Sequence, residues 1–364
     1  MTGWRPPQLE LTGESYEIGL SHGRSLRPQI LNQIDLYRDL FQRNCKFSWQ
    51  HVLEIAKEFE VTIGGLAPHL LEEMRGIADG VGDIGLLDIV ALNSRSEIAL
   101  GLWNDGCTAL AWNLPSKQIL AQNWDWMTAC GQNLAMVHIQ QAQKPDIWMV
   151  TEPGIVGKIG FNSSSVGVCL NAIRARPTST TLLPIHVHLR LALESSSVDA
   201  AIAGIEKLGG SASSQHILIA DARGGRGLEL SPLGSVYLEE NHDGILVHTN
   251  HFLLNKLVDE PSWLSGSPIR LERISVLCNE LKAELSNEKL TEAIQPDVLR
   301  QRVFSDSINS PQAICCSPDP ARGPLARIET LFNIVMVLHA DEAPQAEVVF
   351  GRPDSPSETY LMPW

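Results

Sequence analysis

The sequence lacks several features that would define its class at once. No apolar run reaches the length of a membrane span. The first ten residues have no basic start followed by an apolar stretch, so we expect no secretory signal. No Cys-x-x-Cys pair occurs, and the seven cysteines are an odd, scattered set. This usage favours a reducing compartment over a disulfide framework or a structural zinc site, and we expect a cytoplasmic protein.

Positive charge is also scarce. The chain has 28 Lys and Arg residues against 42 Asp and Glu residues, a formal net charge of −14. This balance argues against nucleic acid or an anionic membrane as the main partner. Apolar residues make up 44% of the 364 residues, which is typical of a globular protein with a sizeable core.

The glycines form no phosphate-binding motif. Gly154, Gly157 and Gly160 are three residues apart, and residues 223–227 form a basic glycine turn. Neither stretch has the strand–GxGxxG–helix or Walker pattern that binds phosphate. We interpret these glycines as strand and turn residues and expect no nucleotide cofactor.

The hydrophobic pattern changes near residue 106. Helical spacing dominates the first hundred residues, with a glycine-rich break at residues 80–85. Beyond it, strand patterns at 107–112 and 118–124 flank residues 113–117, which is typical of a hairpin. Further strands are expected at 136–139, 147–151, 166–171, 217–220, 227–230, 236–238, 245–248, 331–339 and 347–350, and helices at 182–194, 198–208 and 269–281. This order predicts an α+β sandwich with sheets packed together and helices outside.

Cys107 stands at this junction, directly after Gly106, in the run from Asn104 to Ala109. A thiol after glycine can attack the preceding carbonyl, because glycine lacks a Cβ and tolerates strained backbone angles. This N-to-S acyl shift would break the Gly106–Cys107 amide bond. Hydrolysis of the thioester would then leave Cys107 with a free α-amine, whose ordinary pKa of about 7.7–8.0 suits a base. One residue would supply nucleophile and base. Taken alone the pattern is weak, since most buried cysteines are inert apolar residues.

Asp125 ends the second strand of the same predicted hairpin. The return of the hairpin brings it near Cys107, where a carboxylate could hold the freed ammonium. The alternative is a solvated turn residue or a helix cap, which is favoured when the residue is taken alone.

Four histidines raise the question of a metal site. His186 and His188 would share a face on a strand, but residues 182–194 have a helical pattern and no carboxylate at a matching spacing. We interpret these two, with His248 and His251, as buried or surface histidines, and expect no metal.

Longer motifs resemble those of the acyl-coenzyme A:6-aminopenicillanic acid acyltransferase family, the isopenicillin N acyltransferases. These are self-cleaving N-terminal-nucleophile hydrolases, and the resemblance covers almost the whole chain. It rests on Tyr16-Glu17-Ile18-Gly19, His22-Gly23, Glu73-Met74-Arg75-Gly76-Ile77-Ala78, Leu92-Asn93-Ser94-Arg95, Asp105-Gly106-Cys107-Thr108, Gln122-Asn123-Trp124-Asp125, Gly157-Lys158-Ile159-Gly160-Phe161-Asn162, His248-Thr249-Asn250-His251 and Leu331-Phe332-Asn333-Ile334. Because these motifs are long and occur in the same order, a chance match is improbable.

The resemblance implies a four-layer αββα sandwich. It also implies a helical lead-in of residues 1–106 and a catalytic part of residues 107–364, which stay associated in one globular unit after self-cleavage. The substrate would be a small-molecule amide or an acyl thioester. Acyl-coenzyme A is a candidate substrate and not a cofactor, and no cofactor is expected.

The resemblance also implies roles for single residues. Cys107 would be the nucleophile, Asp125 its partner and Asn250 a donor to the oxyanion, a task suited to a neutral side-chain amide. Asn171 resembles an asparagine of related amidases that lines the same hole, although a strand-end asparagine is often a turn former. Arg270 lies in a weaker match and is either a substrate-binding residue or a solvated helix arginine.

The sequence departs from the family pattern at Cys316. Residues 313–316 read Ala-Ile-Cys-Cys, where the penicillin-forming enzyme has Ser-Ile-Cys-Arg, so a permanent charge is replaced by a thiol. The peroxisomal tripeptide of the fungal enzyme is absent at residues 362–364. Amide chemistry is therefore better supported than a penicillin substrate.

Two other classes stay open. One is a catalytically silent homologue that acts as a binding protein, and the other is a thiol redox protein. The intact run around Cys107 and the presence of Asp125 favour the enzyme. The redox class lacks a resolving cysteine at a recognisable spacing.

Overall fold

The computed structural model of the protein describes residues 4–99, 106–261, 266–284, 287–323, 326–355 and 358–364. Its strands are β1 (Gln8–Thr12), β2 (Gly106–Leu114), β3 (Lys117–Met127), β4 (Ala135–Gln140), β5 (Ile147–Thr151), β6 (Ile159–Asn162), β7 (Gly167–Ala172), β8 (Gln215–Asp221), β9 (Gly224–Leu230), β10 (Val236–Glu239), β11 (Ile245–His248), β12 (Ile328–Leu338), β13 (Gln345–Phe350) and β14 (Thr359–Met362). Its α-helices are α1 (Ser15–Ser25), α2 (Arg27–Leu40), α3 (Trp49–Leu66), α4 (Pro68–Val81), α5 (Leu86–Asn93), α6 (Arg95–Ile98), α7 (Ile185–Leu193), α8 (Val198–Lys207), α9 (Ser267–Glu284), α10 (Asn287–Ala293) and α11 (Pro296–Leu299). Two short π-helices, η1 (Phe41–Cys45) and η3 (Arg300–Phe304), and a 3₁₀-helix, η2 (Thr128–Asn133), complete the described helices.

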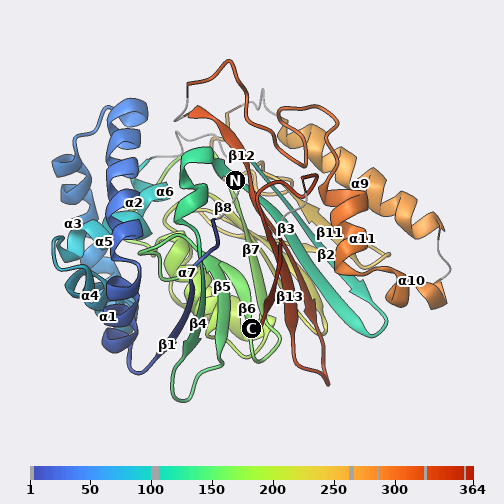
Figure 1. The fold of residues 1–364 in the computed structure, drawn as a ribbon, viewed down its shortest axis with the longest axis horizontal. Helices are drawn as coiled ribbons and strands as arrows, with labels where there is room; N and C mark the ends of the chain where they lie inside the picture. The colour runs from blue at the N-terminus through green and yellow to red at the C-terminus, as the bar shows by residue number, and fades with distance from the viewer. Residues whose placement is uncertain (1–3, 100–105, 262–265, 285–286, 324–325, 356–357) are drawn as a thin grey trace.

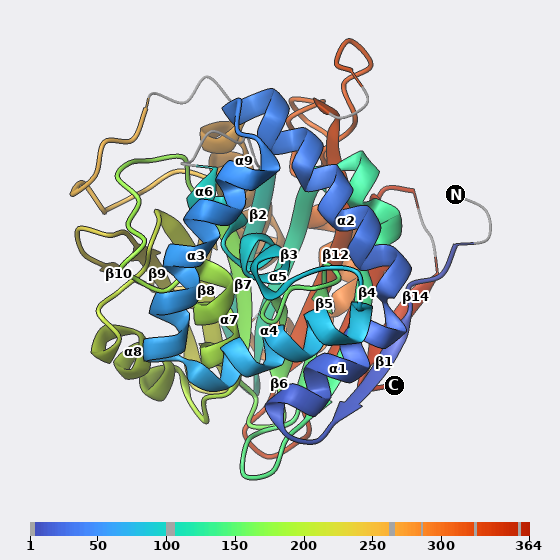
Figure 2. The same ribbon diagram turned by 90° about the vertical axis from the view of Figure 1, so that its left-hand side faces the viewer.

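Two sheets lie face to face between two helical layers (Figure 1). The larger sheet has the strand order β1-β4-β5-β6-β7-β8-β9-β10, and the smaller has β11-β2-β3-β12-β13-β14. Helices α1–α5, α7 and α8 cover the outer face of the larger sheet (Figure 2), and α9–α11 cover the smaller one. The predicted αββα sandwich is confirmed.

The hairpin β2–β3 lies inside the smaller sheet and is buried on both faces. Leu110 and Trp112 pack outward with Ile274 of α9, whereas Ala109 and Ala111 face the larger sheet and belong to the main core. A strand covered on both sides reads as a nearly continuous apolar run, and this is why the sequence predicted β2 and β3 well.

The lead-in is mainly helical, as predicted, and the glycine break is confirmed at Gly82, which ends α4 with φ +86°. The lead-in also contains a strand that the sequence did not predict. In β1 only Leu9 and Leu11 are buried, and the strand pairs in parallel with β4 at the edge of the larger sheet. Five residues with two buried side chains are a weak signal beside the helical runs that follow.

The lead-in and the residues after the junction share one hydrophobic core. The main cluster contains Ile30 and Phe59 from the lead-in together with Val150, Phe161 and Leu189 from the residues after the junction. None of the described helices is long and apolar enough to cross a bilayer.

Candidate active site

Cys107 is the second residue of β2. Its backbone pairs with Trp124 across the hairpin, and both side chains belong to the cluster of apolar residues between the sheets. Because side chains alternate along a strand, the thiol faces the larger sheet, whereas Gly106 and Thr108 face α9. The Cys107 side chain is buried.

Gly106 and Asp125 are direct cross-strand partners. A Cβ added to Gly106 would lie 2.9 Å from Oδ2 of Asp125, so a glycine is needed for this close approach. Gly106 lies in strand β2, and the glycine provides clearance for the carboxylate. Asn104 and Asp105, the other members of the predicted junction, lie outside the described residues.

Asp125 is fully buried inside β3, so its interpretation as a solvated turn residue or a helix cap is wrong. The hydroxyl of Thr330, on the neighbouring strand β12, donates to its Oδ1 at 2.6 Å. The same hydroxyl oxygen accepts the backbone N–H of Cys316 at 3.0 Å. The Thr330 hydroxyl therefore links the backbone of Cys316 to the Asp125 carboxylate.

Asn250 and Arg270 converge on the backbone of Cys107. Oδ1 of Asn250 accepts the Cys107 N–H at 2.8 Å and also accepts from Nη2 of Arg270 at 2.8 Å. Nη1 of Arg270 donates to the Cys107 carbonyl oxygen and to Oγ1 of Thr108. Arg270 is 4% exposed, so the solvated alternative is wrong. Its guanidinium is engaged with the strand that carries the thiol.

Asn171 lies on β7 of the facing sheet and is fully buried within the strand. Cys169, two residues earlier, shares its face. Burial and, to a smaller extent, the nearby Cys107 thiol raise the pKa of Cys169 well above its ordinary value. Asn171 therefore faces the space that contains the Cys107 thiol. Its neighbour Ala172 accepts from Nδ2 of Asn250 at 3.0 Å, and this contact joins the two asparagine-bearing segments.

A buried charged cluster beside Cys107 was assigned no role from the sequence. The carboxylate of Glu152 accepts from Arg95 at 2.5 Å and from Lys158 at 2.7 Å. Nζ of Lys158 lies 4.0 Å from the ring centroid of Trp124, the cross-strand partner of Cys107. Burial lowers the pKa of Lys158 to about 8, against the opposing effect of Glu152. Two cations around one carboxylate favour a further anion nearby, such as a thiolate.

One signal in the sequence could have identified Lys158. It is a lone charge between Gly157 and Ile159 in an apolar stretch, and a lysine is almost never fully buried without a partner. The acidic partner, however, comes six residues earlier, in a turn between two strands. Sequence spacing alone did not suggest the pair.

The histidines considered for a metal are core residues. His186 and His188 lie in α7, which is a helix as predicted, and both are fully buried, as is His248. His251 is partly buried. Among the described residues no group of three or more His, Cys, Asp or Glu side chains could hold a metal ion.

Comparisons with known proteins identify relatives of the chain. Residues 112–305 match the family described as acyl-coenzyme A:6-aminopenicillanic acid acyl-transferase. A curated relative, the 40 kDa form of acyl-coenzyme A:6-aminopenicillanic-acid-acyltransferase from Emericella nidulans, is 35% identical over 354 residues, which cover 96% of this chain and 94% of the relative.

Two solved structures are similar at a greater distance. One is an N-acylethanolamine-hydrolyzing acid amidase orthologue of Caenorhabditis elegans, with 14% identity, a TM-score of 0.42 and coverage of 71% of this chain and 100% of that one. The other is penicillin V acylase from Agrobacterium tumefaciens, with 13% identity, a TM-score of 0.46 and coverage of 70% and 85%. At these TM-scores neither likeness adds to what the chain's own architecture establishes.

Proposed function

Because the chain belongs to the acyl-coenzyme A:6-aminopenicillanic acid acyltransferase family, whose chemistry is acyl transfer at amide bonds, we propose that it is a self-processing cysteine enzyme of the N-terminal-nucleophile type. It cleaves or transfers an acyl group through a thioester on Cys107. The observation that carries the proposal is the arrangement of Asn250 on the Cys107 nitrogen with Asp125 against Gly106.

Maturation begins with the Cys107 thiol. Its sulfur adds to the Gly106 carbonyl carbon, the Gly106–Cys107 C–N bond breaks, and the nitrogen takes up a proton as an amine. Water then hydrolyses the thioester, which leaves a carboxylate on Gly106 and returns the thiol. The contact between Asp125 and Gly106 supports this step, because the carboxylate lies beside the bond that breaks and can hold the resulting ammonium.

The mature enzyme then uses the new amine as a base. The amine of Cys107 accepts the thiol proton, and the thiolate attacks the carbonyl of a small amide or thioester. The ammonium returns the proton to the leaving group, and water or an acceptor amine releases the acyl group from sulfur. The existing hydrogen bond from the Cys107 nitrogen to Oδ1 of Asn250 supports this assignment, because it already orients the nitrogen that becomes the base.

The oxyanion is assigned to the two asparagines. One amide hydrogen of Asn250 binds Ala172, which leaves the second for a ligand. Asn171 adds an amide from the facing sheet. Arg270 is assigned a supporting role, because its guanidinium is bound to the Cys107 carbonyl and to Asn250 and not directed at free space.

Denaturing gel electrophoresis tests self-cleavage. From the mass of 40.0 kDa, cleavage before Cys107 gives fragments of about 12 and 28 kDa, residues 1–106 and 107–364. Cys107→Ala should stay at full length and be inactive, whereas Cys278→Ala, at a buried cysteine of α9, should be cleaved normally. Both fragments should elute together in gel filtration. An intact wild-type chain that nevertheless hydrolyses amides contradicts the mechanism.

A substitution pair separates the two ends of the Asn250 amide. Asn250→Ala removes a donor to the oxyanion, which typically lowers kcat about 10²–10³-fold, with a much smaller change in KM. Asn250→Asp keeps an oxygen for the Cys107 nitrogen but lacks the NH₂ group, so its kcat should fall similarly. Unaltered turnover in either variant would remove Asn250 from the oxyanion site.

The fate of the acyl group depends on which nucleophile reaches the thioester. An acyltransferase must hold the amine in place against abundant water. Burial and the Asp125 carboxylate raise the pKa of Cys316 well above its ordinary value, so this thiol is neutral and supplies no charge for a carboxylate on an amine. We therefore expect hydrolysis to dominate and penicillin-forming transfer to be weak.

The assay supplies phenylacetyl-coenzyme A with and without 6-aminopenicillanic acid and measures free acid against amide. Cys316→Arg should raise the amide fraction, and Cys316→Ser, which adds no charge, should not. Amide as the main wild-type product would refute the expectation, and no rise with Cys316→Arg would remove its cause. A catalytically silent homologue would show neither product in any of these assays.

A further inference from the structure

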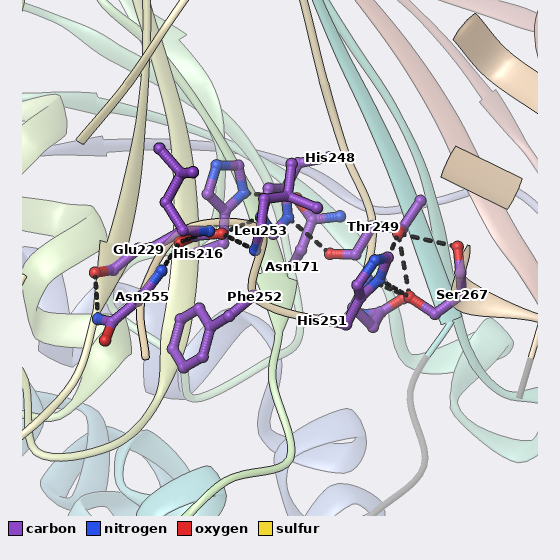
Figure 3. Close-up of polar contacts among 12 residues, drawn as sticks. Asn171, His216, Glu229, His248, Thr249, His251, Phe252, Leu253, Asn255 and Ser267 are labelled. Carbon is purple, nitrogen blue, oxygen red and sulfur yellow. Dashed lines mark hydrogen bonds and ion pairs between the residues drawn. The ribbon is translucent and has the colours of Figure 1, made fainter. Parts of the chain in front are cut away.

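A row of buried polar side chains crosses three neighbouring strands of the larger sheet (Figure 3). Asn171 on β7 is paired in register with His216 on β8, and His216 is paired with Glu229 on β9. All three are fully buried. Directly opposed residues share a face of a sheet. The row meets His248, which β11 brings from the other sheet.

The contacts of His248 make it an imidazolium. Its Nδ1 lies 2.8 Å from the Thr249 carbonyl oxygen, and its Nε2 lies 3.0 Å from Oε1 of Glu229. The Glu229 carboxylate also accepts the backbone N–H groups of Leu253 and Asn255, so it is ionised. Burial would raise the pKa of Glu229, but these hydrogen bonds lower it. Both nitrogens of His248 therefore face acceptors, and both donate.

His216 stacks on this cation and is neutral. The two ring centroids are 3.4 Å apart, with 14° between the planes. Burial and, next, the charge of His248 lower the pKa of His216 well below its ordinary value. A neutral imidazole has one N–H. Nδ1 of His216 lies 3.0 Å from Oδ1 of Asn171, an acceptor, so the proton is on Nδ1.

The surroundings of Nε2, the other ring nitrogen of His216, are consistent with this tautomer. Nε2 lies beside Gly227, where an added Cβ would be 2.8 Å away. No hydrogen-bond partner reaches Nε2 among the residues that the structure describes. An unpaired lone pair there costs less than an unpaired N–H would cost in a medium that solvates neither.

Asn171 is thereby held with its NH₂ group turned away from His216. Nδ2 of Asn171 is buried and has no acceptor within the described part of the chain. A buried donor without a partner is costly and is expected where a transient negative charge must be met. Cys169 lies on the same face of β7 as Asn171, and burial and the nearby Cys107 thiol raise its pKa.

We propose that His216 is a positioning residue for acyl transfer: its Nδ1–H holds the oxygen of Asn171, so that the NH₂ group meets the oxyanion formed at Cys107. This inference rests on the proposed function. On the other sheet, His248 binds the Thr249 carbonyl and Glu229, which fixes the segment that carries Asn250. One stacked imidazole pair thus aligns donors from both sheets on one oxygen.

A matched pair of substitutions tests the role of Nδ1. His216→Asn places an amide N–H near the position of Nδ1, whereas His216→Gln places one near Nε2. With phenylacetyl-coenzyme A, His216→Gln should lower kcat about 10²-fold and leave KM within about twofold, as for loss of one oxyanion donor. His216→Asn should keep kcat within about tenfold of wild type. His51→Asn, at an exposed histidine of α3, is the control and should be unchanged.

The combination with Asn171→Ala sharpens the test. If His216 acts through Asn171, Asn171→Ala/His216→Gln should be no slower than Asn171→Ala alone. Equal losses in His216→Asn and His216→Gln, a change in KM alone, or additive losses in the double variant would each overturn the inference.

A second measurement does not depend on turnover. In ¹⁵N-histidine NMR spectra of the full-length Cys107→Ala chain, His216 should have a protonated Nδ1 and an unprotonated Nε2, and His248 should be protonated at both nitrogens. A proton on Nε2 of His216 overturns the inference even if Cys107-dependent turnover is present. If the Cys107→Ala chain has the expected tautomers but the wild-type chain shows no Cys107-dependent turnover, the proposed function is contradicted, and with it the role of the pair.

Discussion

Both helical layers pack on the sheets through apolar clusters, but they differ in the ion pairs that accompany this packing. Between the lead-in and the later part of the chain, Arg95 binds Glu152, and Glu73 binds Arg190 at 2.8 Å. Glu152 also binds Lys158, which belongs to the later part. Each of these side chains is at most 4% exposed. Helices α9–α11 pack on the smaller sheet through a second apolar cluster.

Ion pairs in the second layer lie mostly at its margin. Arg300 of η3 binds Glu347 of β13 at 2.8 Å, with the two side chains 11% and 30% exposed. Arg270 of α9 is buried, but it forms hydrogen bonds with the strand backbone at Cys107 and with Asn250.

This difference has a physical meaning. Buried ion pairs add little net stability over apolar packing, but breaking one is costly, so they select a single arrangement of the groups they join. Apolar contacts tolerate repacking more easily. Under the proposed self-cleavage the lead-in becomes a separate chain and needs such selection, whereas α9–α11 stay covalently joined to their sheet. The first layer therefore suits the proposed two-chain enzyme.

The largest effect is expected from Glu152→Gln. It removes the buried carboxylate charge that Arg95 and Lys158 share and should lower the free energy of unfolding by about 3–5 kcal/mol. Urea unfolding in the uncleaved Cys107→Ala background measures this change on one chain. A loss below about 1 kcal/mol, typical of an exposed pair, would break the comparison between the layers.

Acid should weaken the first layer through His22. Its Nε2 accepts the Gly154 N–H at 3.0 Å, and burial, then the charge of Arg190, lowers its pKa to about 4 from 6.5. The unfolded chain binds the proton first, so this contribution is complete above pH 6.5 and is lost as the pH falls toward 4. The difference corresponds to about 3 kcal/mol.

The measurement compares unfolding at pH 7 and pH 4.5 in two variants. His22→Gln keeps an acceptor for Gly154 but takes up no proton, so its stability should depend less on pH than that of the parent. His51→Gln, at an exposed histidine, should behave like the parent. An unchanged pH dependence in His22→Gln would show that this contact does not weaken the layer in acid.

A smaller effect is expected in the apolar layer. Ile274→Val removes one buried methylene between α9 and the smaller sheet and should cost about 1 kcal/mol. The cost should be nearly independent of pH and salt, because no charge is involved. A strong salt dependence in urea unfolding would contradict the apolar character assigned to this layer.

The smallest effect is expected from Glu347→Gln. The Arg300–Glu347 pair is partly exposed and joins η3 to β13, so its loss should cost less than about 1 kcal/mol. This variant is the matched control for Glu152→Gln, since both remove one carboxylate charge. Equal losses from the two would show that burial does not distinguish the layers.

Much of the fold could be predicted because the signals are local. The apolar runs of β2 and β3 enclose a short turn, and Gly82 ends α4 with a positive φ that glycine adopts readily. Strands β1, β6 and β14 were missed. Each has four or five residues, and β1 has only two buried side chains.

The proximity of Cys107 and Asp125 was also predictable, because a hairpin's register follows from its turn and sequence separation. Their assigned roles, and those of Asn250, Asn171 and Arg270, came from the resemblance and stay predictions. The structure excluded solvated positions for Asp125 and Arg270. It also showed that Gly106 provides clearance for a carboxylate.

The sequence by itself determined most of the order of elements, the α+β sandwich and the hairpin that brings Asp125 to Cys107. Only the tertiary structure decided that His216 stacks on His248 and that Arg95 and Lys158 share the carboxylate of Glu152. Periodicity and turn chemistry act over a few residues and leave a readable pattern. Ion pairs and ring stacking depend on how segments that are distant in the sequence pack together, and no local sequence pattern records that packing.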